Sequence, residues 1–191
     1  MTLGWFVHFF GLAFVYAALA TGLAVGGLAG FGRVRAAWHA APAIMATAFF
    51  VFLTQHPFPD PAVMDCPLAR AEPQLRPFHF LDTVAMLHDR GVGLRGWLTN
   101  KTLAAVVMNV VICAIIGAAL ARHVRRLRTA ALFGAGLTLS VELTQLTGVW
   151  GLFPCPYRQF NVDDLILNMT GVLSGFVLVR RVLARGGVRG T

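Results

Sequence analysis

Charged residues are scarce in this chain. Only 13% of its 191 residues are charged and 57% are hydrophobic, and the mean hydropathy is +0.70. A soluble domain carries about a quarter charged residues, so the composition excludes an ordinary soluble domain. The apolar residues also run in long blocks. Because lipid satisfies no backbone hydrogen bond, such blocks cross a bilayer as helices, and we predict an all-α, polytopic membrane helical bundle that forms one domain over residues 1–191.

Acidic residues are scarcer still, with eight Asp and Glu against sixteen Lys and Arg, which gives a formal net charge of +8. A basic chain can bind nucleic acid through its phosphates. Here, however, the basic residues gather at the ends of the apolar blocks, as topology signals do. We therefore expect no nucleic-acid partner.

The usual motifs of metal and nucleophilic catalysis are missing. There is no CxxC and no Cys/His spacing typical of a metal site. His79, His88 and Asp82 would form a metal cluster only if folding brought them together, and we interpret both histidines as interfacial side chains. No Ser/His pair, Cys/His pair or phosphate loop is evident, so carboxylate acid–base chemistry is the one enzymatic route that the sequence offers. We expect no metal and no cofactor.

Five apolar blocks are long enough to cross a hydrocarbon core of ~30 Å at ~1.5 Å per residue. Prolines from Pro57 onward end the second block, because proline removes a backbone donor and disfavours helix in the preceding residue. A polar region, 56–101, separates the second block from the third, and residues 78–87 within it are apolar enough for a short interfacial helix. The predicted spans are 2–31, 37–55, 102–121, 129–150 and 163–183.

The basic residues predict the orientation. The connection after the first span, the connection after the third and the C-terminal tail together hold ten basic residues and no acidic one. Cytoplasmic loops carry this excess of Arg and Lys. We predict an N-terminus outside, a C-terminus in the cytoplasm, and residues 56–101 on the outer face of the cytoplasmic membrane.

Two of the three cysteines then fall in predicted outer loops, where disulfides form. Cys66 lies in the long polar region and Cys155 in the short loop before the fifth span, whereas Cys113 lies within the third span. A Cys66–Cys155 bridge would tie the two loops together. Two free thiols are the alternative.

Polar side chains cluster where the fourth and fifth predicted spans meet. Glu142 and Gln145 are three residues apart and share a helix face, and so do Asp164 and Asn168 at a spacing of four. An ionised side chain at membrane depth costs several kcal/mol and normally turns inward, pairs and marks a working site. We predict an outward-facing polar pocket that binds a ligand through six residues: Glu142, Gln145, Arg158, Asp163, Asp164 and Asn168.

A structural interpretation of this cluster stays open. Polar side chains hydrogen-bond between membrane helices for about 1 kcal/mol, and Asn168 with the nearby Gly171 and Gly175 suits that role. A carboxylate such as Glu142 costs more free energy at membrane depth than one such hydrogen bond returns, which favours a functional role for this residue. Arg158 is able to bridge these carboxylates or to contact phosphate or carboxylate on a ligand.

The pattern of these polar residues resembles the VanZ-like family. The resemblance rests on Glu142-x-x-Gln145, then Arg158, then a segment at 163–171 that reads Asp-Asp-xxx-Asn-xx-Gly. Upstream, residues 76–87 look like the family's Pro-Phe segment, and residues 109–117 look like its Asn-led apolar stretch. Together they cover about 73–180. This chain has isoleucine at 116, where a proline often precedes the glycine, and an insertion at 150–157.

The resemblance implies a bacterial cell-envelope membrane protein, since the family is named after a protein that raises resistance to teicoplanin. Our hypothesis is an outward pocket that binds a lipid or a lipid-linked cell-wall molecule and affects teicoplanin susceptibility. One alternative is a non-catalytic structural partner of an envelope complex. Another is an intramembrane lipid-modifying enzyme with Glu142 as general base. A small transporter fits poorly, because no internal repeat is evident.

Overall fold

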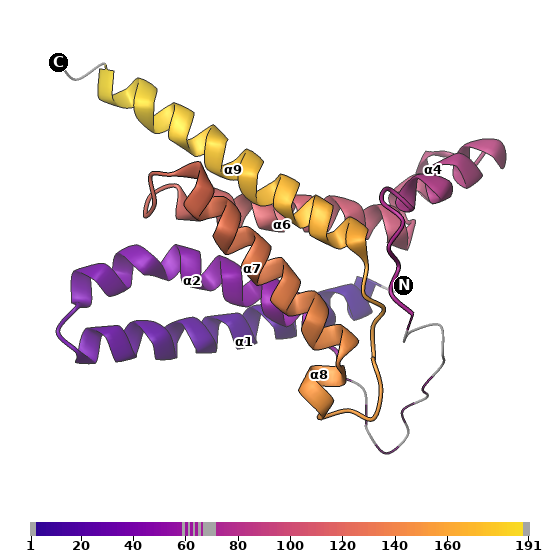
Figure 1. The fold of residues 1–191 in the computed structure, drawn as a ribbon, viewed down its shortest axis with the longest axis horizontal. Helices are drawn as coiled ribbons and strands as arrows, with labels where there is room; N and C mark the ends of the chain where they lie inside the picture. Colours follow the sequence, from indigo (N-terminus) through magenta and orange to yellow (C-terminus); the bar gives the residue numbers. More distant parts are fainter. Residues whose placement is uncertain are drawn as a thin grey trace.

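The computed structural model describes residues 3–58, 60, 62, 64, 66 and 72–188. Thr2 of the first predicted span, and residues 59, 61, 63, 65 and 67–71 of the predicted outer region, lie outside them. The described residues fold into eight helices with no strand, which confirms the all-α prediction (Figure 1). The helices are α1 Leu3–Gly30, α2 Val34–Gln55, α4 Phe80–Asp89, α5 Leu94–Leu98, α6 Lys101–Leu120, α7 Leu127–Leu146, α8 Gly148–Gly151 and α9 Val162–Val188.

Four helices are long and apolar enough to cross a membrane, and they match four of the five predicted spans. The remaining predicted span, 129–150, which is the fourth along the chain, corresponds to α7, which is not among the four candidates. At 20 residues α7 is about 30 Å long, the thickness of a hydrocarbon core. Its polar residues Thr138, Glu142 and Gln145 lower its hydropathy, and all three are buried. The helix ends at Leu146, since the backbone turns at Gly148 into left-handed conformations.

The helices run back and forth between two ends of the molecule (Figure 1). α1 and α2 form an antiparallel hairpin, and α6, α7 and α9 form a second group that packs against α2. The start of α1, the described residues of the connection 56–100 and the connection 147–161 lie at one end, which we call the loop end. The turns 31–33 and 121–126 and the C-terminal end of α9 lie at the other, which we call the arginine end. The segments with the excess of arginine are therefore together.

The contact between α6 and α9 is built on glycine. A Cβ atom added at Gly175 would lie 2.0 Å from the carbonyl oxygen of Ala114, and one added at Gly117 would lie 2.0 Å from that of Val172. Gly171 meets α6 in the same way. The two backbones thus touch with no room for a side chain, which is the close-packing role expected of such glycines in membrane helices.

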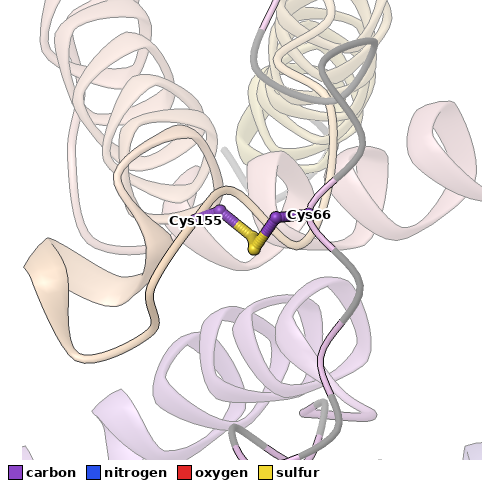
Figure 2. The surroundings of a disulfide bond; sticks show 2 residues. All are labelled: Cys66 and Cys155. Carbon is purple, nitrogen blue, oxygen red and sulfur yellow. A yellow bond between two sulfur atoms is a disulfide. The ribbon is translucent and has the colours of Figure 1, made fainter.

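A disulfide between Cys66 and Cys155 joins the two connections at the loop end, as Figure 2 shows. Their Cα atoms are 5.8 Å apart, and the predicted bridge is confirmed. Cys113 is free and buried in α6. A second tie joins the same connections, because the Gln74 N–H donates to the Phe160 carbonyl at 2.8 Å and the Gln74 carbonyl accepts from Val162 at 2.9 Å.

The segment predicted as an interfacial helix at 78–87 forms α4. This helix lies at the loop end, beside the start of α6 (Figure 1). It exposes Leu81 and Met86 and buries Leu87. Its apolar exposed positions suit the membrane interface. The predicted helix is present, and its location at the interface stays a prediction.

Gly175→Ala and Gly136→Ala are expected to change stability in opposite directions. The methyl group at 175 meets the α6 backbone, and such overpacking costs about 1–3 kcal/mol. Gly136 has nothing within 4 Å of its added Cβ, so alanine there gains up to about 1 kcal/mol of helix propensity. Unfolding midpoints of the purified variants in detergent measure both effects. A destabilised Gly136→Ala or an unchanged Gly175→Ala would contradict the glycine contact.

Maleimide labelling of the unfolded chain tests the disulfide. In SDS without reductant we expect one adduct per chain, on Cys113, and with reductant we expect three. Mass spectrometry counts the adducts. The Cys113→Ser variant is the control. It should give no adduct without reductant and two adducts with reductant. Three adducts without reductant would mean that the bridge does not form.

Candidate functional site

The start of α9 is the point at which the polar side chains meet. Asp163 is 3% exposed, and its Oδ1 accepts from the backbone N–H of Phe78 while its Oδ2 accepts from Phe80 at 3.0 Å. Phe80 is the first residue of α4, where a backbone N–H has no intrahelical acceptor, and Phe78 lies in the turn just before the helix. Asp163 therefore caps α4 from another helix. It also holds Phe78 at φ +61, a left-handed conformation that residues with a Cβ rarely adopt.

The neighbouring Asp164 points to a different helix. Its Oδ1 accepts from Nδ2 of Asn109 on α6 at 2.8 Å. Asn109 is the first residue of the apolar stretch 109–117 that carries the upstream part of the resemblance. Two adjacent carboxylates thus attach α9 to α4 and to α6.

Glu142 and Gln145 connect α7 to its neighbours. Glu142 is 2% exposed, and its Oε2 accepts from the backbone N–H of Asn161 at 2.9 Å. Gln145 is buried and donates through Nε2 to the Thr54 carbonyl at 2.9 Å. The shared face predicted from their spacing is therefore real, and it joins α7 both to the start of α9 and to the end of α2.

Asn168 makes the interhelical contacts that the structural interpretation expects of it. Its Nδ2 donates to Oγ1 of Thr138 on α7 at 2.8 Å. Its Oδ1 accepts from Sγ of Cys113 on α6 at 3.4 Å. One amide group in the core joins three helices, with Asn168 itself 3% exposed.

Arg158 is half-buried, and its Nη2 donates to the His56 carbonyl at 2.9 Å. None of the ion pairs within the described part of the chain joins Arg158 to a carboxylate. The carboxylates still act on it over a distance. Burial lowers the pKa of Arg158, while the neighbouring Tyr157, Asp164 and Glu142 raise it. The guanidinium thus lies near acidic groups without direct contact.

Tyr157 and Gln55 were not expected to take part in this cluster. The Tyr157 hydroxyl donates to Oε1 of Gln55, and Nε2 of Gln55 donates to the Val141 carbonyl at 3.3 Å. Burial raises the pKa of Tyr157 to about 12, against the effect of Arg158. The sequence offered a weak signal for both, since Gln55 is a polar residue at the end of an apolar span and Tyr157 precedes Arg158.

A cavity of about 170 Å³ lies between α4, α6 and the start of α9. Of the six predicted site residues, Asp163 and Asp164 line it, whereas Glu142, Gln145, Arg158 and Asn168 do not. The sequence did not indicate the other polar groups, because short connections and single threonines carry no spacing signal. The cavity is lined by His79, Phe80, Thr83, Thr102, Ala105, Val106, Asn161, Asp163, Asp164 and Leu167.

This cavity is amphipathic. Its polar part offers carboxylate, hydroxyl and imidazole groups, which accept or donate hydrogen bonds, and its apolar part consists of Phe80, Ala105, Val106 and Leu167. Ligand sites commonly combine apolar walls with a few polar groups. Among the described residues no group of three or more His, Cys, Asp or Glu is able to hold a metal ion.

The fold and this cluster define a multi-pass helical membrane protein with a buried polar network at one end. The sequence model of the VanZ/LLP1 family matches residues 40–184, which is most of the chain. The chain belongs to the VanZ/LLP1 family, as its resemblance indicated, and the match begins within α2, upstream of residue 73. No curated protein and no solved structure matches the chain.

Asp163→Ala is expected to release the first turn of α4. The variant loses the acceptor of two backbone hydrogen bonds, each worth about 1.5–3 kcal/mol when the acceptor is charged. Amide hydrogen exchange over residues 78–82 should accelerate at least about tenfold, which corresponds to ~1.4 kcal/mol.

Asp82→Ala is the matched control for this measurement. Asp82 pairs with Arg76 at 2.7 Å, but both side chains are about half exposed, and exposed ion pairs contribute little. Exchange at 78–82 should change little in this variant. If the two variants accelerate exchange equally, Asp163 does not anchor α4.

Proposed function

We propose that this VanZ/LLP1-family protein binds the head group of a lipid or lipid-linked cell-wall molecule in the cavity at its loop end. The binding lowers susceptibility to teicoplanin in the bacterial envelope. The observation that carries the proposal is the amphipathic cavity itself, because Asp164 and two threonine hydroxyls lie beside apolar walls between membrane helices.

The position of the cavity favours a ligand that arrives from the bilayer. One wall belongs to α6, which is a candidate membrane span and exposes Val107 and Val111 on its surface. Another belongs to α4, whose exposed Leu81 suits the interface. A lipid that diffuses in the leaflet reaches such a site sideways, with its chains still in hydrocarbon. A water-soluble ligand gains nothing from those surroundings.

Arg158 supports a phosphate-bearing head group. A guanidinium carries five N–H donors, and the hydrogen bond to His56 engages one of its nitrogens, Nη2. Arginine binds phosphate in a bidentate manner. Arg158 does not line the cavity, whereas Asp164 does, so the guanidinium would meet the phosphate of a head group that extends beyond the cavity.

The burial of Glu142 supports binding over catalysis. Its carboxylate is 2% exposed, is absent from the cavity lining and accepts from Asn161. A general base must come within hydrogen-bond reach of the proton that it removes. The enzymatic alternative with Glu142 as base therefore has less support than a binding role in which Glu142 fixes the start of α9.

Asp164→Asn tests the proposal. The asparagine keeps an oxygen to accept from Asn109, so the fold should persist, but the negative charge in the cavity is lost. In a glycopeptide-sensitive host, the wild type should raise the minimum inhibitory concentration of teicoplanin, and the variant at equal expression should not. Lipids copurified with each protein, identified by mass spectrometry, should include one species that the variant lacks.

Asp89→Asn is the control, since this carboxylate is also at the loop end but is 79% exposed. It should behave as wild type in both measurements. An Asp164→Asn variant with an unchanged phenotype and unchanged copurified lipid would refute the site. If wild type shows neither phenotype nor lipid, the role as a structural partner of an envelope complex is the better account.

A further inference from the structure

A second hollow lies between α2, the end of α6 and the beginning of α7. It has a volume of about 450 Å³ and is almost entirely apolar. Six of its lining residues belong to α2, one to α6 and one to α7. The residues that define it best are Ala43, Thr47, Ala48, Phe52, Leu120 and Phe133.

The α6 and α7 side of this groove lies near the arginine end, whereas its α2 side runs from Ala43 toward Phe52. Leu120 is the last residue of α6, and Phe133 lies in the second turn of α7, so the turn 121–126 passes beside the groove. That turn and the first residues of α7 carry four exposed arginines, namely Arg122, Arg125, Arg126 and Arg128. No acidic residue occurs between Asp89 and Glu142. An apolar groove therefore ends at a concentrated positive charge.

We infer that this groove holds an acyl chain of an anionic phospholipid, whose phosphate lies on the arginines of the turn between α6 and α7. The site is separate from the cavity at the loop end and does not depend on its function. Charge complementarity selects the head group, because basic pockets between membrane helices bind anionic head groups. The apolar lining of α2 selects the chain.

The dimensions of the groove argue against another protein helix as the occupant. Its residues on α2 extend from Ala43 to Phe52, a rise of about 14 Å at ~1.5 Å per residue. A partner helix that crosses the membrane needs a contact surface along much of ~30 Å. A short groove with charge at one end fits a lipid, in which the charged group and the chain are joined at one point.

Lipid binding to the purified protein in neutral detergent tests this inference. Native mass spectrometry is used to titrate phosphatidylglycerol and phosphatidylcholine that carry the same acyl chains. We expect phosphatidylglycerol to bind at least about tenfold more tightly, a difference of ~1.4 kcal/mol. Replacement of all four arginines of the turn by glutamine should abolish this preference.

A control variant with the same loss of charge distinguishes a specific lipid site from nonspecific attraction by the basic protein. Changing Arg33, Arg35, Arg180 and Arg181 to glutamine removes the same charge at the same end of the molecule and should leave the preference intact. Ala48→Phe, which fills the groove, should weaken binding of phosphatidylglycerol by at least about tenfold. Ala36→Phe, at an exposed position of the same helix, should not.

Three results would overturn the inference. Equal affinity for the two lipids would remove the role of charge, and an equal loss in the two arginine variants would show that the charge acts without a site. Unchanged binding in Ala48→Phe would place the lipid elsewhere. Thermal midpoints of all variants, measured without added lipid, identify any variant that fails to fold, and Arg122→Gln alone then replaces the fourfold variant.

Discussion

The contact between the first turn of α9 and its neighbours determines the rest of this structure. Within four residues, Asn161 donates to Glu142 on α7, Asp163 caps α4, and Asp164 accepts from Asn109 on α6. Backbone and carboxylate groups here satisfy each other, as the low dielectric of a membrane protein requires. The start of one helix thereby fixes three others.

The close approach of α6 and α9 fixes the position of the first turn of α9 relative to its neighbours. Gly117, Gly171 and Gly175 let the two backbones touch, so α9 has little freedom to slide or rotate against α6. Asn168 adds a polar contact to both α6 and α7 in the middle of the same surface. The carboxylates at the start of α9 consequently lie at fixed positions, and the cavity between α4, α6 and α9 has a defined shape.

The sequence allowed prediction of everything that depends on local pattern. Apolar blocks predicted the four candidate membrane spans, because helix length and hydropathy are properties of contiguous residues. Spacing predicted the shared faces of Glu142 with Gln145 and of Asp164 with Asn168. The cavity depends instead on a contact between Phe78 and Asp163, 85 residues apart. No spacing pattern in the sequence predicts a contact between residues so far apart, so His79, Thr83 and Thr102 were not foreseen as cavity residues.

The disulfide has a consequence for how the chain is inserted. Cys66 and Cys155 are separated by 89 residues, which include both α6 and α7. If α6 crosses a bilayer, the cysteines reach the same side only when α7 crosses back, as the predicted spans require. A chain in which α7 fails to return leaves one thiol in each compartment, and the bond cannot close. The closed bond therefore requires both connections to lie on one side, and it restrains α7, the long helix that is not among the four candidate spans.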